Sequence, residues 1–316
     1  MTRAQNDSML APKSLRGIIA ACLTPFRDGR VDYGALEREI DYIVDDCRAD
    51  AISIAAVEAS EYTQLSWDER KELVRRGIQM VDRRIPTIAG VSHPAPRCAL
   101  ELAEHAAACG ADLVQALMPQ RPWGGEPTPA EMVAYFSAIA EASPLPLVAY
   151  HNPGPGADPA ISTLIELSKL ERIHYFKESS RDITKIGRLI EDIDRTDDAR
   201  YFTTMQPLLI TLMLGGSGGT MPPPGAWMGA RVVQAVREGD LERARELART
   251  FSVFPGKWGS YGLPPLMKAA LRHLGLDIGD VAPPYQPLTP SDEASLKDFL
   301  ATSAFEPAHV SATTRA

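Results

Sequence analysis

The sequence of 316 residues predicts a (β/α)8 barrel (TIM barrel), an α/β fold, followed by a C-terminal helical extension. Short apolar segments occur eight times, amphipathic stretches lie between them, and the apolar segments do not alternate with polar residues. Strands that alternate with helices favour a parallel sheet, and continuously apolar strands are typical of a parallel sheet buried on both faces. Eight such units fit a closed barrel better than a doubly wound sheet.

The expected strands lie at 17–23, 51–55, 85–91, 112–117, 146–150, 173–177, 201–204 and 218–221. A helix is predicted after the first strand because Leu36, Ile40 and Ile43 recur at helical spacing. Another is predicted after the second strand, with apolar residues at 73, 74, 78 and 81. This second helix opens with Ser66 and Glu69 in the spacing of a capping box, in which each side chain satisfies a backbone donor of the other residue.

The domain organisation follows from this pattern. The barrel is expected at 15–235 and the helical extension at 236–303, with helices at about 234–274 and 291–300 that prolines at 264–265 and 283–287 interrupt. The extension is too short to bury a core of its own. The segments 1–14 and 304–316 are expected to be flexible tails.

Composition excludes several classes of protein. The content of 45% hydrophobic and 23% charged residues is ordinary for a globular chain, and the net charge of -8 argues against nucleic-acid binding. No signal peptide and no run of membrane-spanning length is recognisable, so a cytoplasmic protein without a membrane partner is expected. The four cysteines show no C-x-x-C spacing, which indicates neither a zinc site nor a disulfide framework.

Lys177 and Tyr150 are the first candidates for chemistry. In such barrels the active site lies at the carboxyl ends of the strands, and these two residues end neighbouring strands. An amine can attack a carbonyl, and a phenol beside it can move the protons of that step. Lowering the pKa of a lysine from about 10.4 by about three units corresponds to about 4 kcal/mol, which burial can supply. The alternative is a strand-end lysine that pairs with Glu178.

A series of short motifs resembles the dihydrodipicolinate synthase/N-acetylneuraminate lyase family over about residues 15 to 300. The motifs are Gly17 with 23–26, Ser60-Glu61 with 65–66 and 69–70, 88–90, 110–112, Tyr150 with Asn152-Pro153, 176–180, 215–218 and 265–268. The resemblance implies that Lys177 is the Schiff-base lysine and Tyr150 the proton-shuttling tyrosine. It also implies a homotetramer or dimer of dimers, a small 2-keto acid as substrate, and no metal or organic cofactor, because the lysine iminium is itself the electron sink.

The chain departs from the family at the positions that choose the substrate. The loop after the second strand reads Val57-Glu58-Ala59-Ser60-Glu61, so Glu58 stands where the synthases carry the threonine of a proton relay. Gln120-Arg121 replace the synthase's aromatic pair, Pro155 replaces its substrate-binding arginine, and 203–205 lack the acidic turn of the sialic-acid lyases. Neither dihydrodipicolinate synthase nor sialic-acid lyase activity is therefore expected.

Glu58 is the most informative of these substitutions. A carboxylate beside Tyr150 is a candidate catalytic acid/base for removing water from a 3-deoxy-2-keto acid. In the alternative interpretation, Glu58 points away and pairs with Arg121 at a subunit contact. Arg121 itself is a candidate substrate-binding residue, because its planar fork suits a carboxylate or hydroxyls.

The remaining substrate-binding candidates are mostly backbone groups. Ala59 and Ser60 are expected to hold the 2-keto-acid carboxylate through N–H groups and the Ser60 hydroxyl, and Gly219 and Thr220 are expected to contact the keto acid. Strand alternation turns His151 away from the side that Tyr150 faces, so a supporting role is expected for His151. The six histidines show no paired ligand spacing, and no metal site is predicted.

These expectations lead to a Schiff-base-forming lyase that acts on pyruvate or a related 2-keto acid. The reaction is either aldol cleavage and condensation or dehydration of a 2-keto-3-deoxy acid. Three alternatives stay open: a dihydrodipicolinate-synthase-like condensation, a barrel that binds 2-keto acids without turnover, and a metal-dependent barrel aldolase.

Overall fold

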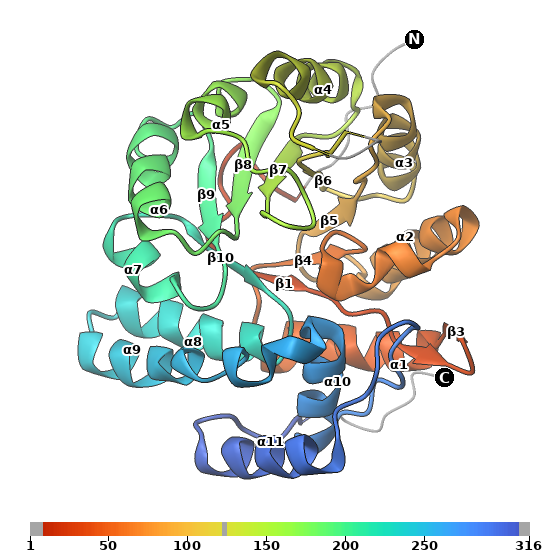
Figure 1. Cartoon of the computed structure of the whole chain (residues 1–316), viewed down its shortest axis with the longest axis vertical. Coiled ribbons are helices and arrows are strands. Elements are labelled where there is room, and N and C mark those ends of the chain that lie inside the picture. Colours follow the sequence, from red (N-terminus) through yellow and green to blue (C-terminus); the bar gives the residue numbers. More distant parts are fainter. Residues whose placement is uncertain (1–8, 122–124, 310–316) are drawn as a thin grey trace.

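The computed structural model describes residues 9–121 and 125–309, which form a closed barrel of parallel strands surrounded by helices (Figure 1). The barrel strands pair in the order β1-β10-β9-β8-β7-β6-β5-β4 and back to β1. They are β1 (Gly17–Ala21), β4 (Ala51–Ile54), β5 (Thr87–Gly90), β6 (Leu113–Leu117), β7 (Leu147–His151), β8 (Ile173–Glu178), β9 (Arg200–Thr203) and β10 (Gly218–Met221). The short strands β2 (Phe26–Arg27) and β3 (Arg30–Val31) form a separate hairpin. The predicted (β/α)8 barrel is confirmed.

Each barrel strand is followed by a helix on the outside of the barrel. These helices are α1 (Tyr33–Asp41), α2 (Trp67–Val81), α3 (Pro96–Ala108), α4 (Pro129–Ala142), α5 (Ile161–Ser168), α6 (Ile183–Leu189), α7 (Leu208–Met213) and α8 (Gly225–Arg237). Two π-helical turns, η1 (Tyr42–Asp46) and η4 (Ile190–Asp194), extend α1 and α6. The capping box predicted for α2 is present: Ser66 Oγ accepts from the Glu69 backbone N–H, and the Glu69 carboxylate accepts from that of Ser66.

In the half of the barrel nearer the amino ends of the strands, one side chain from most strands packs into the interior. This cluster contains Leu15, Ile19, Ala51, Ile88, Leu113, Val148, Tyr175 and Phe202. Because successive side chains of a strand point to opposite faces, the next inward position on β7 after Val148 is Tyr150, and on β8 after Tyr175 it is Lys177. The packing of the interior therefore aims both candidate residues at the carboxyl end of the barrel.

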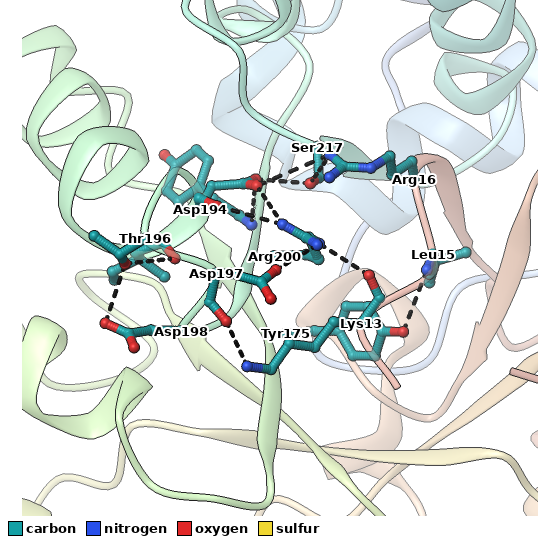
Figure 2. A network of polar contacts seen from close by, with 12 residues as sticks. Lys13, Leu15, Arg16, Tyr175, Asp194, Thr196, Asp197, Asp198, Arg200 and Ser217 are labelled. Atoms are coloured by element: carbon teal, nitrogen blue, oxygen red, sulfur yellow. Dashed lines mark hydrogen bonds and ion pairs between the residues drawn. The ribbon is translucent and has the colours of Figure 1, made fainter. Parts of the chain in front are cut away.

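At the amino end of the barrel, a network of polar contacts joins the segment before β1 to the neighbouring strands (Figure 2). Asp194 is buried there and accepts hydrogen bonds from the Tyr201 backbone N–H (2.9 Å) and from Ser217 Oγ (2.7 Å). Arg200 joins this carboxylate to the incoming chain, since its Nη1 lies 3.3 Å from Asp194 Oδ1 and its Nε donates to the Lys13 carbonyl oxygen. This end is occupied by structural contacts, so a substrate site is left to the opposite end.

The C-terminal extension contains α9 (Leu241–Ala248), α10 (Leu263–His273) and α11 (Pro290–Thr302), with 3-10 turns η5 (Arg249–Ser252) and η6 (Gly256–Tyr261) between the first two. It is anchored to the barrel by Lys268 of α10. The Lys268 Nζ lies 2.5 Å from Glu61 Oε2 and donates to the Thr24 and Asp280 carbonyl oxygens. This buried lysine holds the extension against the carboxyl-end loops.

The two segments expected to be flexible contact the rest of the chain where the structure describes them. The Met9 N–H donates to Asp112 Oδ1 (2.7 Å), the Ala308 N–H donates to the Leu274 carbonyl oxygen (2.8 Å), and Phe305 packs against Phe254. The rest of the expected tails, 1–8 and 310–316, lies outside the described residues. Within the described ranges, no helix combines the length and apolar character needed to cross a membrane.

Candidate active site

Lys177 lies near the carboxyl end of β8 with its side chain in the barrel mouth and only 4% of its surface exposed. Burial disfavours the charged ammonium and lowers the pKa of Lys177 to about 7, although the nearby Glu58 carboxylate acts in the opposite direction. Tyr150 is its register partner on β7, and the Lys177 Nζ lies 3.7 Å from the centroid of the Tyr150 ring. A substantial fraction of this amine is therefore neutral, and so nucleophilic, near pH 7.

Tyr150, Glu58 and Asn152 form a hydrogen-bonded group next to the lysine. Tyr150 Oη donates to Glu58 Oε2 (2.9 Å), while Asn152 Nδ2 donates to Tyr150 Oη (2.9 Å) and to Glu58 Oε2 (3.3 Å). Burial raises the pKa of Tyr150 well above its usual value, and the adjacent carboxylate raises it further. The phenol is therefore a proton donor toward Glu58, and the pair provides one acid and one base in contact.

The loop after β4 brings Glu58 to this position. Gly90 on the neighbouring strand has no side chain, and a Cβ there would lie 1.8 Å from the Ala55 carbonyl oxygen, so the loop passes directly over it. The loop then forms the turn η2 (Glu58–Ser60), which ends at Glu61 in a left-handed conformation (φ 50°). Glu61 is fixed by Lys268 and by the Ala282 N–H, which donates to Glu61 Oε1 (2.8 Å). The extension thus supports the segment that carries Glu58.

A cavity of about 230 Å3 surrounds these groups. Its walls come from six of the barrel strands or the loops that follow them and from the extension. The lining residues are Ala21, Val57, Glu58, Ala59, Tyr150, Asn152, Pro155, Lys177, Ser179, Arg181, Thr204, Thr220, Met221, Pro222, Leu263, Pro264 and Tyr285. Lys177, Tyr150, Glu58, Ala59 and Thr220 are the predicted site residues that the structure brings together. Thr220 Oγ1 is buried without a hydrogen-bond partner in the described residues, so a substrate oxygen can pair with it.

Three predicted binding residues lie elsewhere. The Ser60 hydroxyl donates to the Cys22 carbonyl oxygen (2.7 Å) and is not part of the cavity wall. A side chain at Gly219 would point toward Leu208 and the Met221 side chain. Successive positions of a strand face opposite sides, so Gly219 does not share the direction of Thr220. Arg121 lines a separate cavity of about 520 Å3, where its Nη2 donates to Glu131 Oε2 (2.8 Å). The alternative of a Glu58–Arg121 pair is therefore not found.

His151 lies on the outer face of β7, as strand alternation predicts. It is fully buried, with Nδ1 3.2 Å from Glu178 Oε1 and Nε2 2.8 Å from Asp158 Oδ1. Glu178 also accepts from Tyr201 Oη (2.9 Å), so this carboxylate points away from Lys177. The alternative in which Glu178 neutralises the strand-end lysine does not hold, and in the described residues Lys177 has no carboxylate within 4.0 Å.

Of the lining residues that the sequence did not single out, three carry polar groups of interest for a substrate. Asn152 appears only as part of a motif, although an amide two residues after the tyrosine falls on the same face of the strand. Arg181 follows Lys177 by four residues, and a cation in a strand-end turn is a signal for anion binding. Tyr285 lies in the proline-rich connection before α11, and nothing in the local pattern places that connection over the barrel mouth.

Fold and site define the class of (β/α)8-barrel proteins with a buried lysine in the carboxyl-end cavity. Comparison with known proteins gives the family. The chain belongs to the dihydrodipicolinate synthetase family, whose model matches residues 14–303. This family includes pyruvate-dependent Schiff-base lyases and condensing enzymes.

Individual relatives agree with this assignment. The 4-hydroxy-tetrahydrodipicolinate synthase of Enterococcus faecalis is 30% identical over 282 residues, which cover 87% of this chain and 94% of that protein. Two solved structures are similar in fold. YagE of E. coli, a prophage protein solved in complex with pyruvate, has a TM-score of 0.84 at 25% identity and covers 91% of this chain and 98% of its own. A dihydrodipicolinate synthase of Bacillus anthracis has a TM-score of 0.83 at 26% identity, with the same coverage of both chains.

Proposed function

We propose that this protein is a Schiff-base-forming lyase that acts on pyruvate or a related 2-keto acid. The observation that carries the proposal is the buried Lys177 amine with a pKa of about 7, in one cavity with the hydrogen-bonded pair of Tyr150 and Glu58. A relative of the same family, YagE, binds pyruvate in its solved structure, which supports a 2-keto acid as the ligand. No metal or organic cofactor, a homotetramer or dimer of dimers, and a cytoplasmic location belong to the same proposal.

The proposed reaction begins with attack of the neutral Lys177 amine on the C2 carbonyl carbon of the keto acid. The resulting carbinolamine loses its hydroxyl as water and becomes an iminium, with Tyr150 supplying the proton that the leaving hydroxyl takes up. Ala59, which lines the cavity, is assigned to the keto-acid end through its backbone N–H. The Thr220 hydroxyl, which has no partner among the described residues, is assigned to the same end. The positive iminium then stabilises negative charge at C3.

Two outcomes are compatible with this intermediate. In aldol cleavage, a base removes the proton of the C4 hydroxyl and the C3–C4 bond breaks, which leaves an enamine and releases an aldehyde. In dehydration, a base removes a C3 proton and the C4 hydroxyl leaves as water after protonation. Glu58 is close enough to Tyr150 to act as that base in either case, and its acid form can return the proton.

A substrate panel tests the proposed function. Pyruvate release from 4-hydroxy-2-keto acids measures aldol cleavage, and loss of water from 3-deoxy-2-keto acids measures dehydration. We expect turnover in one of the two assays and expect it to survive EDTA. Activity that EDTA abolishes would indicate a metal-dependent aldolase instead. Absence of turnover together with tight 2-keto-acid binding would indicate a binding protein.

Replacing Glu58 with glutamine is expected to lower the turnover number by about tenfold or more, because an amide cannot accept the proton that the carboxylate accepts from Tyr150. Steady-state kinetics with the cognate substrate measure the effect. Glu131→Gln is a matched control, since Glu131 pairs with Arg121 outside the cavity. An unchanged turnover number in Glu58→Gln would remove Glu58 from the catalytic group.

The rate of iminium formation is expected to depend on pH through Lys177. The reactive form is the neutral amine, so below the pKa of about 7 the rate rises by about tenfold per pH unit, and above it the rate reaches a plateau. Borohydride trapping of the pyruvate adduct at short times measures this rate. A rate that keeps rising to pH 10 would show an unperturbed lysine and contradict the effect of burial.

A further inference from the structure

Arg181 occupies a strained position at the rim of the cavity. It follows β8 in the turn before α6, and its backbone is left-handed with φ 63°. Glycine adopts this conformation without cost, whereas an arginine there raises the energy of the folded chain. A strained residue that also lines the cavity of Lys177 is a candidate for a function of its side chain.

The Arg181 guanidinium is held in place by neutral groups. Its Nε donates to Gln206 Oε1 (3.0 Å) and its Nη1 donates to the Ser179 carbonyl oxygen (3.1 Å). Neither partner carries a charge, so the positive charge stays uncompensated while the planar group is oriented. Nη2 makes no hydrogen bond with any described residue, and Nη1 keeps its second N–H. The edge of the guanidinium formed by these two nitrogens is therefore available for the two oxygens of a carboxylate.

The carboxylates nearest in sequence are committed to other partners. Asp182 caps α6 by accepting from the Thr184 and Lys185 N–H groups. Glu178 is bound to His151 and Tyr201 on the outer face of the barrel. In the part of the chain that the structure describes, no carboxylate lies within 4.0 Å of Arg181.

The charge of Arg181 also reaches the reactive amine. Burial is the largest cause of the lowered pKa of Lys177, and Arg181 contributes in the same direction by repelling a second positive charge. The charge of Arg181 is therefore felt inside the cavity that holds Lys177. An anionic group that enters the cavity is attracted toward the rim by Arg181, where the guanidinium fork matches the two oxygens of a carboxylate.

We propose that Arg181 binds a second carboxylate of the substrate, so that the protein prefers a 2-keto acid with an additional carboxylate at the end remote from the keto group. This inference rests on the proposed Schiff-base function. The cavity of about 230 Å3 is smaller than the pockets that hold drug-sized ligands and fits a short dicarboxylic acid. Arg181 is then a specificity-determining residue, and Lys177 performs the chemistry.

The test compares two five-carbon keto acids that differ in the remote group, 2-oxoglutarate with a carboxylate and 2-oxopentanoate with a methyl. Each is titrated against the intact protein with borohydride, and the half-saturating concentration for the reduced Lys177 adduct is read by mass spectrometry. We expect 2-oxoglutarate to half-saturate the wild type at a concentration lower by about tenfold or more, as a charge-assisted bidentate pair would give.

Arg181→Gly and Arg181→Gln are the informative variants. Glycine relieves the left-handed backbone, while glutamine keeps a polar side chain on the strained backbone and removes the guanidinium with its charge. Both are expected to abolish the preference for 2-oxoglutarate over 2-oxopentanoate. Because Arg181 also lowers the pKa of Lys177, its loss affects adduct formation with both acids, and the ratio of the two half-saturating concentrations within each variant is the readout. Arg48→Gly is the matched control, because Arg48 is exposed and left-handed (φ 53°) in the turn before β4, at the amino end of the barrel.

The outcomes separate this inference from the proposed function. Equal half-saturation by the two acids in the wild type, or an unchanged preference in both Arg181 variants, overturns the role of Arg181 alone. Absence of an adduct with pyruvate, 2-oxoglutarate and 2-oxopentanoate overturns the proposed function, and the inference with it. A preference that Arg48→Gly also abolishes would assign it to overall charge and overturn the role of Arg181.

Discussion

Replacing Lys177 with methionine abolishes the pyruvate adduct and lowers turnover by about a thousand-fold or more, because no other described residue that lines the cavity carries a primary amine. Methionine has a similar length and carries no charge, so it removes the cost of burying an ammonium. The fold is therefore expected to be retained and the thermal midpoint to stay the same or rise. The measurements are steady-state kinetics, intact mass after borohydride treatment, and thermal unfolding.

A matched control separates the loss of a nucleophile from the loss of a lysine. Lys257 lies in the extension, where its Nζ donates to Ser295 Oγ (2.8 Å), and Lys257→Met should keep both the adduct and full turnover. Residual activity of Lys177→Met above about a tenth of the wild type would contradict a covalent mechanism through this residue, since removal of a nucleophile usually costs orders of magnitude.

Replacing Tyr150 with phenylalanine is expected to lower turnover by about a hundred-fold, within the range for loss of a positioned acid–base group. The aromatic ring that the Lys177 Nζ contacts stays in place, but the hydroxyl that donates to Glu58 and accepts from Asn152 is lost. The pyruvate adduct still forms, at a lower rate, because the amine remains. Pre-steady-state trapping therefore distinguishes slow proton transfer from loss of the nucleophile.

Tyr135→Phe serves as the control for this variant. Tyr135 lies on α4 and donates to the His93 carbonyl oxygen (2.8 Å), away from the cavity of Lys177, so its replacement should leave turnover unchanged. If Tyr150→Phe kept the wild-type rate of adduct formation and the wild-type turnover, the proton relay would have to be assigned to another group.

The parts of the site that lie on strands could be predicted from the sequence. Lys177 and Tyr150 meet because they end neighbouring parallel strands, and the period of two in a strand turns His151 outward. These properties follow from the backbone and require no knowledge of loop conformation. For the same reason the order of strands and helices in the barrel was predictable from the apolar segments and their spacing.

The parts on loops could not be predicted to the same extent. Arg121 and Ser60 lie close in sequence to strand ends, yet their side chains bond to Glu131 and to the Cys22 carbonyl oxygen outside the cavity. Arg181 and Tyr285 face the cavity because of a left-handed turn and a distant connection. Such placements depend on tertiary contacts, which local sequence patterns do not encode.

The most direct test of the central claim is to locate the covalent adduct. The wild-type protein is treated with pyruvate and borohydride, digested, and mapped by tandem mass spectrometry. We predict a single modified lysine, Lys177, and no modification of Lys268, which is equally buried but bound to Glu61 and two carbonyl oxygens. Modification of a lysine other than Lys177, or no modification by any 2-keto acid, would contradict the account.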